Sequence, residues 1–90
     1  SKSSAEERIA ALLLSISNRN SRRQLSATAF RLPMSRTDIG NYLGLTIETV
    51  SRIFSRLQQQ GVIDADKKEV RITDMEGLHR IANGGDVCHS

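Results

Sequence analysis

Residues 36–53 read RTDIGNYLGLTIETVSRI, a pattern typical of two short helices joined by a tight turn. In such a unit the first helix needs a small residue where the second helix crosses it, and Gly40 meets that need. The turn needs a residue that accepts a positive φ, and Gly44 supplies it. Apolar residues should occupy the fourth, eighth, tenth, fifteenth and eighteenth positions, which are Ile39, Leu43, Leu45, Val50 and Ile53. All these positions are filled, so the pattern favours a helix-turn-helix over an ordinary helical hairpin.

The second helix of this unit, capped by Thr46 and expected to run to about Gln60, has two different faces. At about 100° per residue, four apolar side chains share one side and should face the core: Val50, Ile53, Phe54 and Leu57. Four polar side chains share the opposite side, near the helix N-terminus: Glu48, Ser51, Arg52 and Ser55. In helix-turn-helix proteins the residues at this end enter the major groove of DNA.

The polar residues have side chains that suit the edges of base pairs. Arg52 can donate two hydrogen bonds to guanine, Glu48 can accept one from cytosine, and Ser51 can pair with several edges. Glu48 lies one turn before Arg52 and is expected to hold its guanidinium while making its own base contact. We therefore predict that Glu48, Ser51 and Arg52 contact bases. The alternatives are that Glu48 stabilises the helix dipole and that Arg52 is an exposed helix former.

A second set of residues is predicted to contact the DNA backbone. Ser35 and Arg36 begin the preceding helix, where free backbone N–H groups can hold a phosphate. Lys67 and Lys68 lie at the tip of a predicted hairpin and could reach a flanking phosphate, although a charged turn needs no such reason. The whole backbone-contact set is Ser35, Arg36, Thr46, Thr49, Ser55, Lys67 and Lys68. Within it, Thr46 already has a sufficient role as a helix cap.

The flanking segments complete a winged helix-turn-helix, an α+β fold that is mainly α, with a three-helix core. Residues 4–18 have the apolar spacing of a helix, capped by Ser3 or Ser4, and residues 18–21 should end or fray it. Residues 30–32 alternate like a short strand that stops at Pro33.

A small β-hairpin is predicted after the recognition helix, which itself covers about residues 46–60. Short strands at 62–63 and 70–72 flank a polar tip at 64–69, and together they form the wing, residues 62–72. A last short helix should open at Thr73 and end at the glycines Gly84 and Gly85, with Leu78, Ile81 and Ala82 on its inner side.

Length, charge and hydropathy limit the class of protein. Ninety residues make one domain, expected to cover residues 1–85, with 86–90 as a disordered tail. The net charge is +3, and five arginines without any acid lie between Arg19 and Thr37, which suits a polyanionic partner. No apolar run approaches the roughly 18 residues of a membrane span. Without such a run or a signal peptide, the expected location is the cytoplasm, with no membrane partner.

The sequence contains few residues that could form a metal, cofactor or catalytic site. One cysteine, Cys88, and two histidines, His79 and His89, are too few for a zinc or iron–sulfur site, so no metal or cofactor is expected in this domain. No nucleophile–base arrangement, paired-carboxylate pocket or Gly-rich phosphate loop is found, so the chain is not expected to be an enzyme. The remaining alternative is a winged-helix protein–protein interaction module without DNA binding. Such modules usually lack an arginine on the recognition helix or bury that face, so Arg52 disfavours this class.

Residues 39–45, IGNYLGL, followed by ETVSR at residues 48–52, resemble the FNR branch of the catabolite activator/FNR family of bacterial transcription regulators. Phe30, Arg31, Leu32 and Met34 add to the likeness, which covers about residues 5–82. The catabolite activator carries Arg where this chain has Ile47 and Gly where it has Ser51, and both differences point to the FNR branch.

The resemblance implies recognition of a palindrome with half-sites like TTGAT by a homodimer. Glu48 and Arg52 would read a G·C pair, and Ser51 would help to choose the outer T·A step. The loop at residues 23–29 resembles the surface that touches RNA polymerase in activators. The resemblance also implies an N-terminal sensory domain, absent from this chain, that binds an effector or an iron–sulfur cluster.

Overall fold

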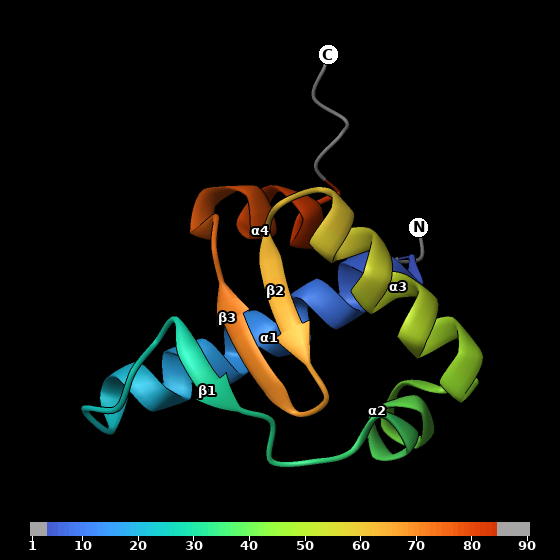
Figure 1. The fold of residues 1–90 in the computed structure, drawn as a ribbon, viewed down its shortest axis with the longest axis horizontal. Helices are drawn as coiled ribbons and strands as arrows, with labels where there is room; N and C mark the ends of the chain where they lie inside the picture. Colours follow the sequence, from blue (N-terminus) through green and yellow to red (C-terminus); the bar gives the residue numbers. More distant parts are fainter. Residues whose placement is uncertain (1–3, 85–90) are drawn as a thin grey trace.

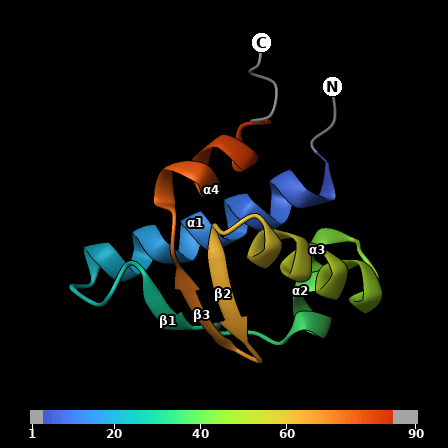
Figure 2. The same ribbon diagram turned by 45° about the horizontal axis from the view of Figure 1, so that its top comes forward.

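The computed structural model describes residues 4–84, in which helices cover a small antiparallel sheet (Figure 1). The elements of this range are α1 (Ala5–Arg22), β1 (Ala29–Arg31), α2 (Arg36–Leu43), α3 (Ile47–Gln59), β2 (Ile63–Asp66), β3 (Glu69–Ile72) and α4 (Met75–Ala82). The long helix α1 lies behind the sheet, α4 packs against α1, and α2 with α3 forms one end of the molecule (Figures 1 and 2). The predicted mainly α winged helix-turn-helix is confirmed.

Helix α1 begins at a capping box and buries one apolar side. The hydroxyl of Ser4 accepts from the backbone N–H of Glu7, and the Glu7 carboxylate accepts from the Ser4 N–H. The prediction that residues 18–21 end or fray this helix was wrong. The helix runs to Arg22, and the backbone N–H of Arg23 still donates to the Arg19 carbonyl. The poor helix propensity of Asn and Ser costs under about 1 kcal/mol per residue, which the hydrogen bonds of an existing helix can offset.

The arrangement of α2 and α3 depends on two glycines, Gly40 within α2 and Gly44 directly after it, as the sequence predicts. Gly44 follows α2 with φ of 75°, in the left-handed region. A Cβ added to Gly40 would lie 2.5 Å from the carbonyl oxygen of Leu45, so the chain after the turn passes directly over this residue. Only a residue without a side chain leaves room for that approach.

The helix-turn-helix is joined to the rest of the molecule through a shared apolar core. Ile39 and Val50 are fully buried, Ile53 is nearly so, and Leu43 and Leu45 pack half-buried against the same core. The four residues predicted for the inner face of α3 are all buried: Val50, Ile53, Phe54 and Leu57. This burial fixes which side of α3 is left for solvent.

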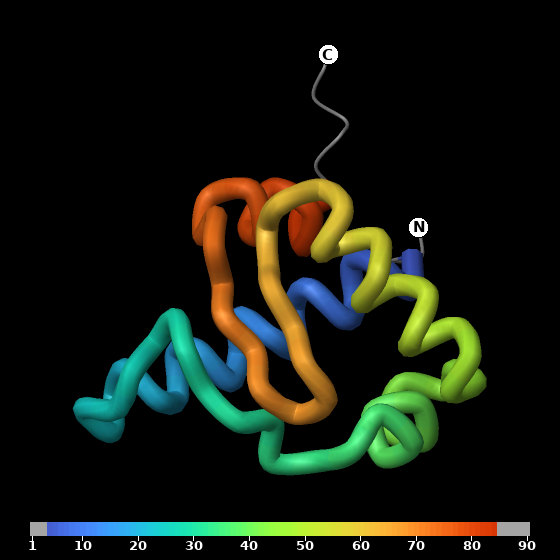
Figure 3. The backbone as a smooth tube through the Cα atoms, in the orientation of Figure 1, coloured from blue at the N-terminus to red at the C-terminus, as the bar shows by residue number. Residues whose placement is uncertain are grey.

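The sheet has the strand order β1-β3-β2, and both pairings are antiparallel. In β1, Phe30 lies opposite Val70, a pairing that the sequence did not predict. The wing strands are longer than predicted, since Asp66 pairs with Glu69, so the tip is only Lys67 and Lys68 rather than residues 64–69. The tip lies on the same lower side of the molecule as α2 in two views (Figures 2 and 3).

Helix α4 closes the domain and is capped by Asp74, not by the predicted Thr73. The Asp74 carboxylate accepts from the N–H of Gly77, whereas the hydroxyl of Thr73 donates to the Gly61 carbonyl. A carboxylate is a strong N-cap and also interacts favourably with the helix dipole, so it takes the position. Leu78 is fully buried. The predicted tail, residues 86–90, lies outside the described residues.

Candidate nucleic-acid interface

The first two turns of α3 present a polar face to solvent. Glu48, Arg52 and Ser55 are exposed, while the opposite side of the helix lies in the core. Thr46 caps the helix, because its hydroxyl accepts from the N–H of Thr49 and donates to the Thr49 hydroxyl. The face predicted to read bases is therefore accessible and is held by a well-packed helix.

The predicted pairing of Glu48 with Arg52 is not formed. Between described residues the structure has two ion pairs, Arg31 with Glu69 at 2.8 Å and Arg56 with Glu6 at 3.7 Å, and neither includes these residues. Glu48 and Arg52 therefore have no ionic partner among the described residues. A guanidinium in that state can donate all its hydrogen bonds to a ligand.

Ser51 differs from its neighbours because it is half-buried and has a charged partner. The Nη1 atom of Arg36, at the start of α2, donates to the Ser51 hydroxyl at 3.4 Å. The guanidinium of Arg36 also lies over the ring of Phe54, 4.6 Å from its centroid. The sequence indicated Arg36 as a backbone contact, and no local pattern links residues 36 and 51.

The N-terminus of α2 holds its own carboxylate. The Ser35 hydroxyl accepts from the N–H of Asp38, and the Asp38 carboxylate accepts from the Ser35 N–H. This capping box occupies part of the donor set that was expected to hold a phosphate. Ser35 and Arg36 lie at the start of α2, and Thr46 and Thr49 lie at the start of α3.

The two wing lysines lie apart from the helix-turn-helix, at the tip between β2 and β3. Lys67 is exposed and Lys68 is half-buried. Lys67 has φ of 57°, a left-handed conformation that costs a non-glycine residue about 1–2 kcal/mol. The Lys68 carbonyl accepts from the N–H of Leu32, which ties the tip to the segment after β1.

An open polar hollow continues the exposed face along α3 beyond the predicted residues. It measures about 500 Å³ and is lined by Arg52, Ser55, Arg56, Gln59 and Gln60. The sequence analysis did not single out Arg56 or Gln59. Their spacing from Arg52, four and seven residues along a helix, is the signal that could have found them.

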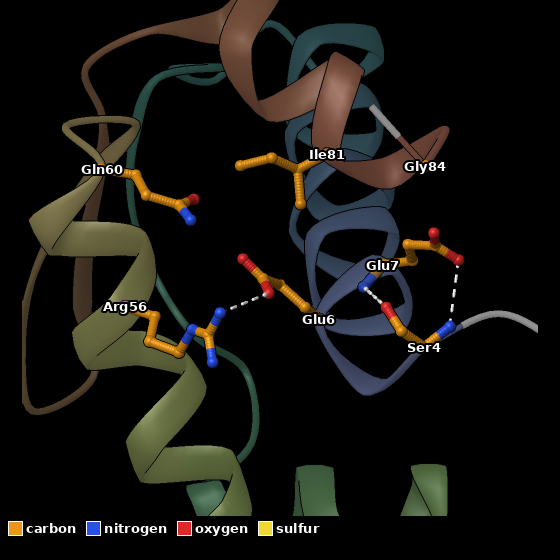
Figure 4. Close-up of a pocket in the computed structure, with 7 residues that line it drawn as sticks. All are labelled: Ser4, Glu6, Glu7, Arg56, Gln60, Ile81 and Gly84. Atoms are coloured by element: carbon orange, nitrogen blue, oxygen red, sulfur yellow. Dashed lines mark hydrogen bonds and ion pairs between the residues drawn. The ribbon is translucent and has the colours of Figure 1, made fainter. Parts of the chain in front are cut away.

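A second hollow, of about 320 Å³, lies between the start of α1, the end of α3 and α4 (Figure 4). Arg56 and Glu6 point toward each other across it.

No group of three or more His, Cys, Asp or Glu side chains placed to hold a metal is found within residues 4–84. Of the helices described, none is long and apolar enough to cross a membrane.

Comparison with known proteins finds relatives of this chain by sequence and by fold. The model of the Crp-like helix-turn-helix domain matches residues 7–81. The transcriptional activator protein FnrA of Stutzerimonas stutzeri is 58% identical over 93% of the chain, and the transcriptional activator protein anr of Pseudomonas aeruginosa is 55% identical over 93%. Among solved structures, FixK2 from Bradyrhizobium japonicum matches 87% of the chain and 38% of its own length, with 42% identity and a TM-score of 0.73. The chain spans 34% of the length of each of the two activators.

Proposed function

As a member of the Crp-like helix-turn-helix family and of its FNR-like branch, this chain is a DNA-binding domain, and we propose that it recognises a specific duplex sequence by placing α3 in the major groove. The observation that carries this proposal is the exposed start of α3, where Glu48 and Arg52 have no ionic partner among the described residues.

Glu48, Ser51 and Arg52 are the proposed base contacts. A carboxylate directed at DNA is unfavourable unless it is paired, and an adjacent arginine or a cytosine amino group can pair it. In the bound state Arg52 takes guanine O6 and N7, and Glu48 accepts from cytosine N4. The pairing of Glu48 with Arg52 that is absent from the free domain then forms on DNA, where both groups lose water.

The proposed backbone contacts come from the helix-turn-helix and from the wing. The first group is Ser35, Arg36, Thr46, Thr49 and Ser55, and the second is Lys67 and Lys68. Phosphate contacts set the register of α3 on the duplex but carry no sequence information. The capping box of Ser35 and Asp38 makes this position the weakest phosphate site of the set, because its carboxylate repels the anion.

For the whole protein we propose a homodimer that binds a palindromic site in the bacterial cytoplasm. This rests on the likeness to the two activators, of which the chain matches about a third. An effector or an iron–sulfur cluster would be bound by a sensory domain outside these 90 residues. The loop at residues 23–29 is the proposed contact with RNA polymerase.

The decisive experiment is a selection from a library of duplexes with a randomised central segment, followed by a salt titration on the winning sequence. A single domain should bind in the range of roughly 10⁻⁴ to 10⁻⁶ M, weaker than an intact dimer. Enrichment of one half-site with an affinity that falls steeply as salt rises supports the proposal. A flat response to salt with no enriched sequence would contradict it and favour the protein-interaction module.

A further inference from the structure

One arginine connects the two helices of the helix-turn-helix through a candidate base-reading residue. Arg36 is the first residue of α2, and its guanidinium lies on the ring of Phe54 and beside the hydroxyl of Ser51, both on α3. Phe54 is fully buried, and Arg36 and Ser51 are both half-buried. Because the ring is fixed by the core, the charge above it has a defined place next to Ser51.

The hydrogen bond between Arg36 and Ser51 can have only Arg36 as its donor. A guanidinium has five N–H donors and no acceptor, so at 3.4 Å the Ser51 oxygen can only accept from Arg36. A positive charge at that distance turns the O–H dipole of Ser51 away from it. The same charge opposes the approach of a second N–H donor to the Ser51 oxygen, whereas it favours donation by the O–H.

We infer that Arg36 is a positioning residue that makes Ser51 a hydrogen-bond donor toward DNA, so that this position accepts a base edge with an acceptor and rejects cytosine. In the major groove, thymine offers O4, guanine O6 and N7, and adenine N7, whereas cytosine offers only its N4 amino donor. The inference rests on the proposed function, because it needs Ser51 to face the groove. It adds a polarity to a residue type that otherwise pairs with any edge.

The role of Arg36 as a positioning residue differs measurably from a role as a phosphate contact. Loss of a phosphate contact weakens binding to all sequences alike and reduces the slope of log affinity against log salt by about 0.9. Loss of a positioning residue leaves that slope unchanged and relaxes the base preference at the one position that Ser51 reads. The packing of the guanidinium on Phe54 and its contact with Ser51 favour the second role, which for Arg36 replaces the phosphate contact proposed above.

The first arm of the test uses variants of the full chain in the duplex-library selection. Ser51→Ala identifies the position that Ser51 reads, because selectivity falls there alone. At that position Arg36→Gln, whose neutral amide can accept as well as donate, should reduce discrimination against cytosine by about fivefold, the factor that corresponds to one net hydrogen bond. The double variant should lose no more than Ser51→Ala. Arg31→Gln, an exposed arginine on β1, is the charge-matched control, and urea unfolding verifies that each variant is folded.

A second arm needs no variant and uses the unaltered chain with modified bases. If thymine is selected, its replacement by 5-methylcytosine keeps the methyl group but turns the O4 acceptor into an amino donor. If adenine is selected, its 7-deaza analogue removes N7, its one major-groove acceptor; if guanine is selected, 7-deazaguanine removes N7 and 2-aminopurine removes O6, and the analogue that lacks the acceptor in use should bind less well. The fall in affinity should be about fivefold or more in each case.

The outcomes separate this inference from the proposed function. If Ser51→Ala leaves every base preference intact, base reading by Ser51 fails and the inference fails with it. If Ser51→Ala relaxes one position while Arg36→Gln keeps that preference and reduces the salt slope, Arg36 is a phosphate contact, and the inference alone is overturned. Selection of cytosine at the Ser51 position, or equal affinity for every modified base, also overturns it.

Discussion

The guanidinium of Arg8, in the second turn of α1, donates a hydrogen bond to the main-chain carbonyl of Leu43, the last residue of α2. The last carbonyls of a helix lack partners within it. A half-buried cation there satisfies one of these carbonyls and interacts favourably with the negative end of the helix dipole. Glu6, two residues earlier, pairs with Arg56 near the end of α3. The start of α1 therefore holds both helices of the DNA-binding unit.

Removal of this contact should destabilise the domain. Arg8→Ala leaves the Leu43 carbonyl half-buried without its charged donor, which should cost about 1.5–3 kcal/mol in the free energy of unfolding. Urea denaturation followed by circular dichroism measures the change. Arg19→Ala, an exposed arginine of the same helix, is the matched control and should change little. Equal midpoints for the two variants would show that the contact contributes nothing.

Arg52→Ala should weaken binding to the selected duplex by about 1–3 kcal/mol and relax the preference at one base pair. The reason is the loss of two hydrogen bonds to one guanine. Fluorescence anisotropy on the selected and on a scrambled duplex measures both affinities, with Arg80→Ala on α4 as the control for the loss of one exposed positive charge. An equal loss on both duplexes would exclude direct readout by Arg52.

Gly40→Ala should destabilise the fold, although alanine is the better helix former. The added Cβ would lie 2.5 Å from the Leu45 carbonyl oxygen, which is backbone and cannot turn aside. We expect a net loss of about 1–3 kcal/mol in the free energy of unfolding, measured in urea. The neighbouring exposed Asn41→Ala is the control, and it should be neutral or slightly stabilising. A stabilised Gly40→Ala variant would mean that the turn can shift away from the helix.

Lys67→Asn should raise the free energy of unfolding by about 0.5–1 kcal/mol, because asparagine tolerates the left-handed conformation better than lysine. If the wing touches a phosphate, the same variant also reduces the salt slope of DNA binding by about 0.9. Lys68→Asn, whose φ is not positive, should share the effect on the slope without the gain in stability. Greater stability with an unaltered slope would remove Lys67 from the interface.

The helix-turn-helix was predictable because its constraints are local. Gly40 allows the chain to pass close to α2, and Gly44 allows the left-handed turn after it. The apolar residues of α2 and α3 follow the spacing that packs these two helices against each other. The exposed side of α3 then follows by elimination. For the same reason the caps at Ser35 and Thr46 could be found from the sequence.

Features that depend on contacts between distant segments could not be predicted. The pairing of β1 with β3 joins Phe30 to Val70, and a three-residue strand carries too few residues to indicate its partner. The hydrogen bond from Arg36 to Ser51 also joins two helices, and the long side chain of Arg36 can reach several places from the same backbone position. The end of α1 was also missed, because local propensity near residue 18 is weak and the surrounding structure decides it.

The two edge strands of the β1-β3-β2 sheet are each poor places for another chain to add a strand, and on β2 the Gln58 side chain already accepts from the N–H of Ala65. On one side β1 has only three residues, too short for a stable ladder with a newcomer. On the other side β2 exposes Asp64 and Asp66, whose carboxylates would meet an incoming backbone and its side chains. The wing is therefore protected against pairing with the strands of other molecules, and a concentrated sample of this domain should not associate through its sheet.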